Sequence, residues 1–151
     1  MSKTTYPTKY SPQLLESIPC DPQDDGWISI ICTEFTSLCP KTGQPDFARI
    51  YINYIAKGLM LESKSLKLYL FSFRNCGEYH ESCVKNIAQE LNKLLTPRYL
   101  EVIGEFTPRG GITIHPYISI ANSEDTYQKL KEQRQSQYAP GRYTLPLQRI
   151  Y

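Results

Sequence analysis

The order in which two hydrophobic periods follow one another is the feature of this sequence that most constrains its fold. Four segments alternate apolar and polar residues, as half-buried strands do: 27–35, 47–55, 99–106 and 112–120. Between the second and third of these segments, apolar residues recur at helical spacing over 64–73 and again from His80 to a stop near Pro97. The order strand, strand, helix, helix, strand, strand predicts an α+β fold with both helices on one face of an antiparallel sheet.

The length of the chain suits one domain. At 151 residues, folding is expected to bury roughly 68–70% of the surface of the unfolded chain, which is enough for a hydrophobic core. We expect a single domain over 1–151 with its core over 26–122. The proline-rich residues 1–25 are expected to form an extended arm, whereas 123–151 become polar and then irregular. Apolar residues in that tail need a surface to cover them, which a neighbouring subunit would supply.

Composition excludes several classes of protein. The net charge of +2, from 17 basic and 15 acidic residues, is too small to predict nucleic-acid binding. No apolar run approaches the roughly 20 residues that a membrane-spanning helix requires, and the N-terminus lacks the apolar stretch of a secretory signal. We therefore expect a cytoplasmic protein with no membrane partner. The five cysteines are odd in number, which argues against a disulfide framework and predicts at least one free thiol.

One cysteine, Cys39, lies in the loop expected between the first two strands, where prolines and a glycine interrupt ladder pairing over 36–46. Cysteines that act as small hydrophobic residues usually lie inside a strand or helix, as Cys32 does. A free thiol has a pKa of ~8.5, so a nucleophilic cysteine needs an electropositive site or a nearby base. Lys41 is a candidate for that role. From these residues alone, Cys39 is equally well a nucleophile or a loop thiol without function.

Asp46 opens the second strand at the other end of the same loop. An aspartate at a turn usually caps its own backbone. If strand pairing closes the loop, however, Cys39 and Asp46 face a common pocket as nucleophile and acid, which is the pair that covalent catalysis requires. The sequence leaves both interpretations open.

Further positions carry side chains suited to ligand binding. Glu81, at the start of the second helix, offers a carboxylate that accepts two adjacent N–H donors, such as those of a guanine-like ring, although a glutamate there also favours the helix dipole. Lys64 and Lys67 share one helix face and suit a phosphate group, or form an ordinary solvated face. Arg109 precedes the tight turn expected at 110–111, where a side chain easily reaches a phosphate. No Gly-x-Gly-x-x-Gly follows a strand, which excludes Rossmann-type dinucleotide binding.

Cys76, His80 and Cys83 are spaced so that one continuous helix would place three metal-type ligands on one face. Gly77 is expected to interrupt that helix, and no Cys-x-x-Cys pair accompanies the three residues. We therefore expect no metal, and we keep zinc binding as an alternative.

With these residues considered, the chain resembles the single-domain branch of the 7-cyano-7-deazaguanine reductases, which work in queuosine biosynthesis for tRNA. The resemblance extends from about Trp27 to Ile120. It rests on four segments in the order of that family: the nucleophile loop Leu38–Phe47, the signature stretch Glu62–Tyr69, the substrate segment Phe73–Glu81 and the cofactor turn Pro108–Gly111. The signature stretch, Glu-Ser-Lys-Ser-Leu-Lys-Leu-Tyr, matches the family pattern at every position.

The resemblance implies the tunnelling fold, shared with GTP cyclohydrolase and related pterin enzymes. Subunits with this fold associate so that their sheets form a barrel, and the sites then lie between subunits. A homo-oligomer is therefore expected, and the family suggests a decamer of two pentamers.

The resemblance also implies a chemistry. Cys39 would attack the nitrile of 7-cyano-7-deazaguanine to give a covalent thioimide, and Asp46 would supply the proton that the developing nitrogen anion needs. Two NADPH molecules would then deliver hydride in turn, leaving an aminomethyl group. The substrate-binding residues expected from the family are Leu61, Glu62, Ser63, Tyr79, His80 and Glu81. Those expected to hold the NADPH phosphates are Lys64, Lys67 and Arg109.

Two rival functions remain open from the sequence. A zinc-dependent cyclohydrolase of the same fold would use Cys76, His80 and Cys83 to activate water. A non-catalytic purine- or tRNA-binding module would use some of the 12 tyrosines as stacking surfaces. The near-neutral charge and the loop thiol count against the second rival.

Overall fold

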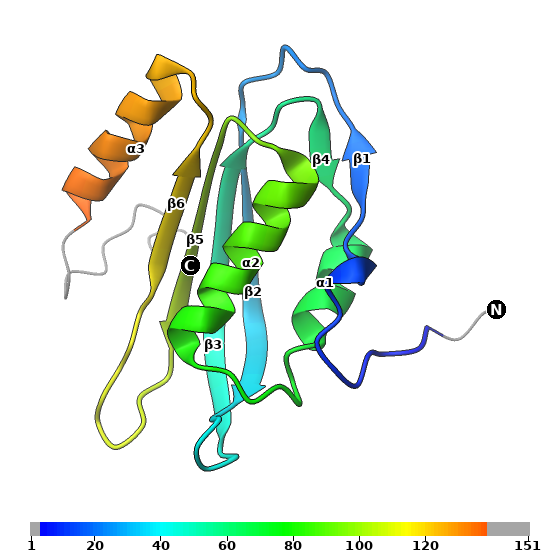
Figure 1. Cartoon of the computed structure of the whole chain (residues 1–151), viewed down its shortest axis with the longest axis vertical. Coiled ribbons are helices and arrows are strands. Elements are labelled where there is room, and N and C mark those ends of the chain that lie inside the picture. The colour runs from blue at the N-terminus through cyan, green and yellow to red at the C-terminus, as the bar shows by residue number, and fades with distance from the viewer. Residues whose placement is uncertain (1–3, 139–151) are drawn as a thin grey trace.

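The structure is a computed structural model and describes residues 4–138 (Figure 1). The strands are β1 (Ser17–Pro19), β2 (Trp27–Leu38), β3 (Pro45–Ile55), β4 (Leu59–Leu61), β5 (Tyr99–Phe106) and β6 (Tyr117–Ala121). The helices are a short 3₁₀ turn (Pro12–Leu14), α1 (Ser63–Phe71), α2 (His80–Leu95) and α3 (Asp125–Gln137).

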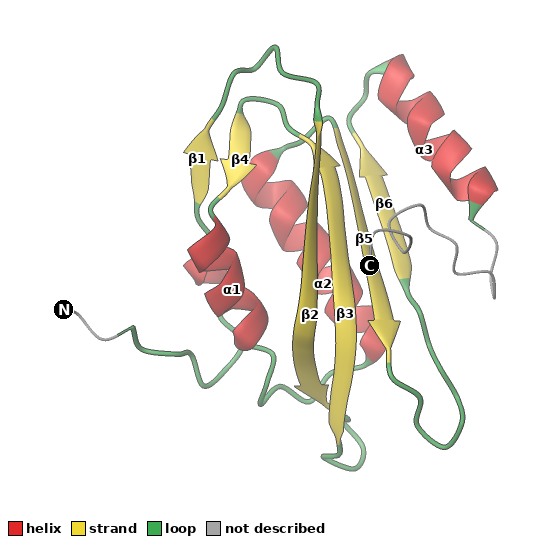
Figure 2. Cartoon of the chain, turned by 180° about the vertical axis from the view of Figure 1, so that it is seen from behind, coloured by secondary structure: helices red, strands yellow, loops and turns green. Residues whose placement is uncertain are grey.

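Four strands form one antiparallel sheet in the order β2-β3-β5-β6, and α1 and α2 cover one of its faces (Figure 1, Figure 2). Alternate residues of the strands supply the buried side, and α2 meets them with the apolar stripe that its helical period predicts. The central contacts come from Ile50, Ile52, Leu100, Val102, Val84, Ile87 and Leu91. The predicted α+β fold, with two helices on one face and the order ββααββ, is confirmed.

A glycine in β5 sets how closely α2 approaches the sheet. A Cβ atom added at Gly104 would lie 2.6 Å from Val84 Cγ2 and 2.8 Å from the Phe106 ring. Only a residue without a side chain fits at this distance. The N-terminal end of α2, which begins at His80, therefore rests directly over the end of β5.

Two strand boundaries differ from the prediction. β2 and β3 pair as far as Leu38 and Pro45, so the loop between them spans 39–44 rather than 36–46; proline is tolerated there because the first residue of a strand need not donate to the ladder. The last strand begins at Tyr117 rather than at residue 112, because Pro116 cannot donate a ladder hydrogen bond.

The tight turn predicted at 110–111 is confirmed. Gly110 and Gly111 have φ values of +57° and +78°. Arg109 and Ile112 exchange two backbone hydrogen bonds of 3.0 Å across them. Both central residues thus adopt the positive φ that a tight hairpin turn requires, and this turn fixes the position of Arg109.

The predicted extended arm over 1–25 is wrong in part. Before β1, the arm runs beside α1, where the Ser11 N–H donates to Ser72 Oγ at 3.1 Å. β1 itself pairs with β4 in a second, two-stranded sheet. Farther along, the Arg98 guanidinium donates to the backbone carbonyls of Pro22 and Ala56. Short strands without strong alternation carry little signal in the sequence, so only these tertiary contacts define them.

After Ser123 the sequence predicted only a polar stretch before the irregular tail, and the structure shows that 125–137 form the helix α3 against β6 (Figure 2). None of its residues is buried, so hydrophobic burial does not explain how it docks. Instead, Arg134 donates to the fully buried Glu101 carboxylate at 2.7 and 3.1 Å, from the face of the sheet opposite α1 and α2. Residues 139–151 of the predicted tail lie outside the described residues.

The ion pair between Arg134 and Glu101 gives a testable prediction about stability. Burial raises the pKa of Glu101, but the hydrogen bonds and charge of Arg134, with donors on Asn53 and Tyr99, outweigh it and lower the pKa overall. We expect Arg134→Ala to lower the free energy of unfolding at pH 7 by about 3 kcal/mol, because it leaves a buried carboxylate without its counter-charge. Urea unfolding at fixed protein concentration measures the loss.

The pH dependence of this loss provides the control. A carboxyl group whose pKa is lowered on folding contributes stability above its unfolded pKa of about 4.3, and this contribution is lost as pH falls through the folded pKa. The difference between Arg134→Ala and the unchanged chain should therefore shrink below about pH 4. Lys131→Ala, on the same helix without such a partner among the described residues, should cost little. A loss that is constant with pH would contradict this account.

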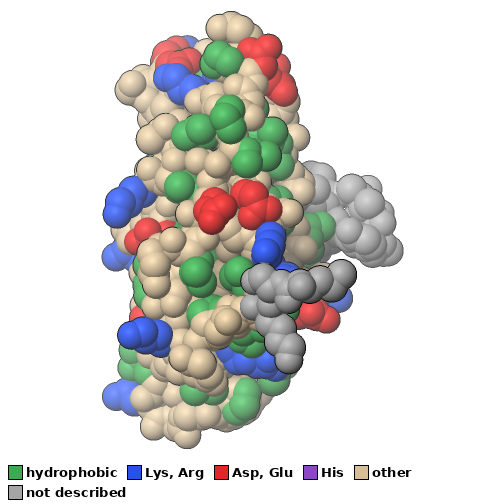
Figure 3. Space-filling view, turned by 90° about the vertical axis from the view of Figure 1, so that its right-hand side faces the viewer, with side chains coloured by type: hydrophobic (Ala, Val, Ile, Leu, Met, Phe, Trp, Pro, Cys, Tyr) green, Lys and Arg blue, Asp and Glu red, His purple; other side chains and the backbone are tan. Residues whose placement is uncertain are grey.

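Within residues 4–138, no helix is long and apolar enough to cross a membrane. On the face that carries α1 and β1, basic side chains are scattered among hydrophobic and acidic ones rather than gathered into one field (Figure 3). This face therefore lacks the continuous basic surface that binding of a nucleic-acid backbone requires.

Candidate active site

Cys39 lies in a closed loop at one end of the sheet. Its N–H donates to the Gln44 carbonyl and its own carbonyl accepts from the Gly43 N–H, both at 2.8 Å. Gly43 has a φ of +71°, which favours glycine because a Cβ atom is disfavoured in that conformation. The loop is also tied to the segment before α2, where Leu38 exchanges backbone hydrogen bonds with Cys76 and Glu78 at 3.0 Å. These bonds bring the start of α2 next to the cysteine loop.

The thiol of Cys39 differs in its electrostatics from the other buried cysteine. Cys39 is buried, with 6% of the residue exposed, and its pKa is nevertheless lowered to about 7. The largest contribution comes from the Thr42 side chain, followed by the backbone N–H groups of Lys41 and Thr42. Burial opposes this shift, and the Arg109 side chain adds a smaller lowering effect. Burial raises the pKa of Cys83 to about 12. Cys39 is therefore about half thiolate near neutral pH, whereas Cys83 is an inert thiol.

Asp46 forms the centre of a buried polar cluster beside this thiol. One carboxylate oxygen, Oδ1, lies 2.9 Å from Arg109 Nε, and the other, Oδ2, lies 3.2 Å from His80 Nε2. The Arg109 Nη2 atom lies 3.2 Å from the same His80 nitrogen. The side chains of Asp46 and His80 are 2% and 4% exposed. The carboxylate and the imidazole are thus buried together, and a partly exposed guanidinium lies against both.

His80 Nε2 cannot hydrogen-bond to both of its neighbours. A ring nitrogen either donates one proton or accepts with one lone pair, and a guanidinium only donates. If Arg109 donates to Nε2, Asp46 Oδ2 is left as a buried oxygen without a hydrogen-bond partner among the described residues. If instead Nε2 carries the proton, it faces the carboxylate at 3.2 Å. In the first arrangement a ligand that donates a hydrogen bond would complete Oδ2.

His80 also has a ring nitrogen without a partner. Among the described residues, nothing hydrogen-bonds to its buried Nδ1 atom. The ring stacks on Phe106, with centroids 3.9 Å apart and planes 9° apart, so its orientation is fixed by packing. A fixed, buried and unpaired nitrogen is unfavourable unless a ligand completes it, and this is the observation in the cluster that points to a bound molecule.

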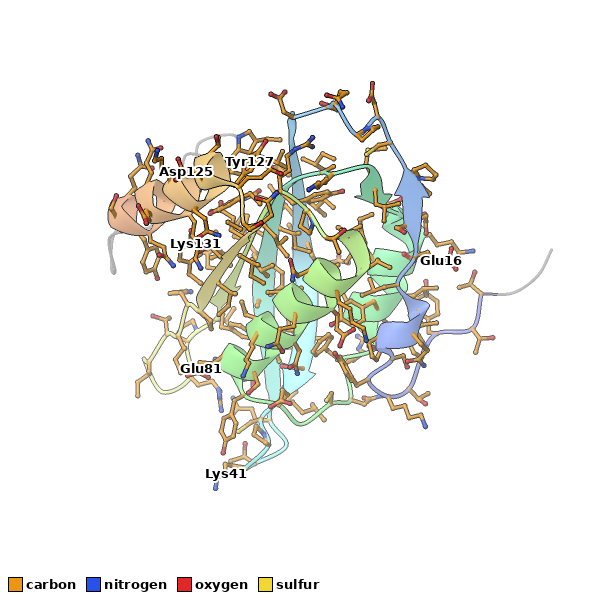
Figure 4. The ribbon with its side chains drawn as sticks, turned by 45° about the horizontal axis from the view of Figure 1, so that its top comes forward. Glu16, Lys41, Glu81, Asp125, Tyr127 and Lys131 are labelled. Carbon is orange, nitrogen blue, oxygen red and sulfur yellow. The ribbon has the colours of Figure 1, made fainter. Side chains whose placement is uncertain are left out.

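Tyr79 and Glu81 flank His80 at the start of α2. Tyr79 is the N-cap residue and its side chain is 50% exposed. Glu81 is exposed in the first helical turn and lies at the same end of the molecule as Lys41 of the cysteine loop (Figure 4). Both predicted substrate-binding residues are therefore accessible beside the buried cluster.

The other predicted substrate-binding residues lie elsewhere in the chain. Leu61 ends β4 and is buried, and its N–H donates to the Tyr54 hydroxyl at 3.1 Å. Glu62 caps α1 and accepts from the N–H groups of Lys64 and Ser65 at 2.8 and 2.7 Å, which lowers its pKa. Ser63 is the first residue of α1 and is exposed. In Figure 1 and Figure 2 this end of α1 follows β4, away from the β2–β3 loop.

Lys64 and Lys67 lie on α1, and Lys67 borders a groove of about 810 Å³ between α1 and the edge strand β2. Ser63 and Arg74 line the same groove, among apolar residues of β2 and α1. Arg109, predicted with the two lysines, instead contacts Asp46 and His80. One chain therefore brings together the predicted catalytic residues with Arg109, but not the full set of predicted cofactor residues.

The geometry behind the zinc alternative is absent from the described residues. α2 begins at His80, so Cys76 lies in the preceding loop and no continuous helix aligns it with Cys83. His80 is engaged with Asp46, and Cys83 is fully buried. Within 4–138, no group of three His, Cys, Asp or Glu side chains is placed to hold a metal ion.

Sequence reasoning missed two contributors to the site. Thr42 contributes most to the lowered pKa of Cys39, and Arg109 lies against Asp46 rather than with the lysines. Thr42 lies three residues after Cys39 in the same loop, so the sequence did indicate a hydroxyl close to the thiol. The position of Arg109 depends on where the 107–116 connection lies in space, and no local pattern reports that.

Comparison with known proteins finds a matching family and close relatives of this chain. A family model described as QueF-like protein matches residues 45–125. The NADPH-dependent 7-cyano-7-deazaguanine reductase of Bdellovibrio bacteriovorus is 56% identical over 151 residues, which covers 99% of this chain and 89% of that protein. Proteins of the same name from Neisseria meningitidis and Streptococcus thermophilus are 54% and 56% identical over 133 residues, or 87% of this chain and 85% and 82% of theirs.

The fold is found in a solved structure as well. The apo crystal structure of the archaeosine synthase QueF-Like superimposes with a TM-score of 0.59 over 65% of this chain and 96% of that one, at 17% sequence identity. This likeness supports the expected tunnelling fold. From the family model and the relatives at 54–56% identity, the chain belongs to the QueF-like family of NADPH-dependent 7-cyano-7-deazaguanine reductases.

Proposed function

We propose that this protein reduces the nitrile of 7-cyano-7-deazaguanine to an aminomethyl group with NADPH, through a covalent thioimide on Cys39, as a step in queuosine biosynthesis. The names of the close relatives support the reduction and the cofactor. The observation that carries the covalent mechanism is a thiol with a pKa of about 7 next to a buried acid cluster.

The first step forms one bond and moves one proton. The Cys39 thiolate attacks the nitrile carbon, one π bond of the nitrile breaks, and the nitrogen, which becomes anionic, takes a proton from Asp46, which lies 3.2 Å from His80. The thioimide therefore contains a new carbon–sulfur bond and a new nitrogen–hydrogen bond. Because the thiol proton passes to the cluster before attack, the step as a whole neither gains nor releases a proton.

When bound, NADPH would supply two hydrides: the first would displace the Cys39 thiolate from the thioimide carbon and leave an imine, and the second, together with one proton, would give the amine. Lys64 and Lys67 are exposed cations on α1, and the groove beside Lys67 also contains Arg74. These residues suit the phosphates of a dinucleotide, since exposed ammonium and guanidinium groups bind phosphate without the cost of burying a charge. Arg109 stays a candidate for the same role, although it contacts Asp46 in the isolated chain.

The separation of the two residue groups supports a site shared by two copies of the chain. Cys39, Asp46, His80 and Glu81 lie at the start of α2, whereas Leu61, Glu62, Ser63 and the lysines lie at the start of α1. A second copy that presented the α1 end to the α2 end of the first would complete the pocket. This arrangement agrees with the homo-oligomer implied by the family.

The proposed activity is tested by the loss of NADPH absorbance on addition of the nitrile. We expect two NADPH to be consumed per nitrile and the amine to be the product identified by mass. Chelator-treated protein should keep the same rate, because the proposed chemistry uses no metal. Bound zinc in the purified protein, with no NADPH consumption, would favour the zinc rival, and tight binding of the nitrile without NADPH consumption and without zinc would favour the binding module.

Glu81 and Lys67 are predicted to affect different ligands. A carboxylate that receives two N–H donors leaves both unpaired when removed, so Glu81→Ala should weaken nitrile binding by about 10-fold or more. Lys67→Ala should instead raise the KM for NADPH, by a factor that falls with added salt. Steady-state KM values for both ligands measure these effects.

Matched controls come from α2 itself. Glu90→Ala removes a carboxylate about two and a half turns from Glu81, and Lys93→Ala removes an exposed cation from the last turn. Neither should change either KM. If Glu81→Ala weakens NADPH and Lys67→Ala weakens the nitrile, the proposed assignment of ligands to the two ends is reversed.

A further inference from the structure

A pair of aromatic rings, Tyr6 and Phe71, lies beside the groove between α1 and β2. Tyr6 comes from the N-terminal arm, which passes along α1 (Figure 1, Figure 2). The two ring centroids are 4.7 Å apart, with the planes at 54°. Phe71 lines the groove, and its volume of about 810 Å³ suits a small-molecule site. Tyr6 is 47% exposed and Phe71 only partly buried, so aromatic surface stays open to a ligand there.

A cation lies at each end of this aromatic pair. The Lys67 Nζ atom is 5.8 Å from the centroid of the Tyr6 ring, and the Arg74 Cζ atom is 5.1 Å from that of Phe71. Both cations line the groove, together with one acidic residue, Glu34, so its lining is net positive. Among residues 4–138, neither Lys67 nor Arg74 forms an ion pair. Their charges are therefore available to an anion.

These side chains suit the adenosine 2′-phosphate half of NADPH. A purine stacks on an aromatic face whatever its hydrogen-bonding edge, and ammonium and guanidinium groups bind phosphate. The nicotinamide ring has to lie against the carbon bonded to Cys39, because hydride transfer occurs there. Adenine is thus the ring of the cofactor that remains for an aromatic platform.

The arm is attached to α1 by contacts that do not involve Tyr6. The Tyr10 ring packs edge-on against Phe73, with centroids 5.1 Å apart, and the Tyr10 hydroxyl lies 3.3 Å from that of Tyr69. The Ser11 N–H donates to the side chain of Ser72. The exposed Tyr6 ring is therefore not needed to hold the arm in place, and it can be replaced with the arm still docked.

We propose that Tyr6 and Phe71 form the platform on which the adenine of NADPH stacks, and that Lys67 and Arg74 bind its 2′-phosphate. This inference rests on the proposed NADPH-dependent reduction and names the residues that select the phosphorylated cofactor. The platform accepts the adenine of NADPH and NADH alike, whereas the two cations distinguish them by the phosphate. The N-terminal arm thereby becomes part of the cofactor site.

Fluorescence titration of the full chain with NADPH and with NADH, without the nitrile, tests the platform. Tyr6→Ala should raise the Kd of both cofactors by a similar factor of about 10, because it removes a ring on which the base stacks. Tyr6→Phe keeps the ring and should bind as the unchanged chain does. Tyr6→Leu keeps apolar bulk against Phe71 but has no aromatic face, so it should bind as weakly as Tyr6→Ala.

The same titrations test the phosphate site. Arg74→Ala should raise the Kd of NADPH by about 10-fold and that of NADH little, because only NADPH carries the 2′-phosphate. Arg74→Met, which keeps an apolar stem against Phe71 without the charge, should show the same selective loss. Added salt should shrink the effect of Arg74→Ala but not that of Tyr6→Ala. Tyr127→Ala on α3 and Lys93→Ala on α2 are the matched controls and should leave both Kd values unchanged.

Unchanged cofactor binding in Tyr6→Ala would overturn the inference. So would full binding in Tyr6→Leu, which would show that Tyr6 only packs against α1, or equal losses of NADPH and NADH in Arg74→Ala. The proposed function fails by a different result, namely an unchanged chain that binds NADPH but consumes none when the nitrile is added. The two failures are distinguishable because the titrations measure binding without turnover.

Discussion

Cys39→Ala should abolish both NADPH consumption and the covalent adduct. Nitrile without NADPH is expected to raise the protein mass by the mass of the nitrile in the unchanged chain, since the thioimide forms before any hydride transfer. The alanine variant lacks the sulfur that makes this bond, so neither the adduct nor turnover through the thioimide should remain. Intact-protein mass spectrometry measures the adduct, and absorbance measures turnover.

Cys76→Ala is the matched control for this variant. Cys76 is a partly exposed loop cysteine tied to Leu38 by its backbone carbonyl, which the substitution leaves in place. It should keep both the adduct and turnover. An adduct of equal yield in Cys39→Ala would assign the nucleophile to another residue. Because the Cys39 pKa is lowered to about 7, adduct formation in the unchanged chain should fall as the pH drops below 7.

Asp46→Asn should keep nitrile binding but slow adduct formation by roughly 10²-fold or more, as loss of a general acid typically does. The substitution nearly preserves shape, and its amide oxygen still accepts from Arg109 Nε. What it removes is the carboxyl group that faces His80 Nε2 at 3.2 Å. Stopped mixing followed by mass analysis measures the rate, and a direct titration measures binding.

Glu105→Gln controls for the loss of an acidic side chain near the same end of the sheet. Glu105 accepts from the Tyr51 hydroxyl at 3.0 Å and is not among the contacts of Asp46 or His80, so adduct kinetics should not change. Adduct formation at an unaltered rate in Asp46→Asn would assign the proton to His80 alone. A loss of binding with an unaltered rate would make Asp46 a substrate ligand rather than an acid.

Much of the fold was predictable because the hydrophobic period is a local property. The alternation over 47–55 and the helical spacing after His80 each depend on residues close in sequence, and each forms the predicted element. α3 was not predictable in this way. Its sequence is mostly polar, and it lies against the sheet through Arg134 and a buried Glu101, a contact between residues far apart in the chain.

The sequence by itself determined which chemical groups this protein has: a loop cysteine with an aspartate at the far end of the same loop, a His-Glu pair at the start of a helix, and two lysines on another helix. Only the tertiary structure decided how they combine. It places Asp46 between His80 and Arg109, because the β2–β3 loop is hydrogen-bonded to the segment before α2 and a tight glycine turn positions Arg109. The pKa of Cys39 is likewise a property of the folded loop, since donors lower it only when backbone geometry points them at one sulfur.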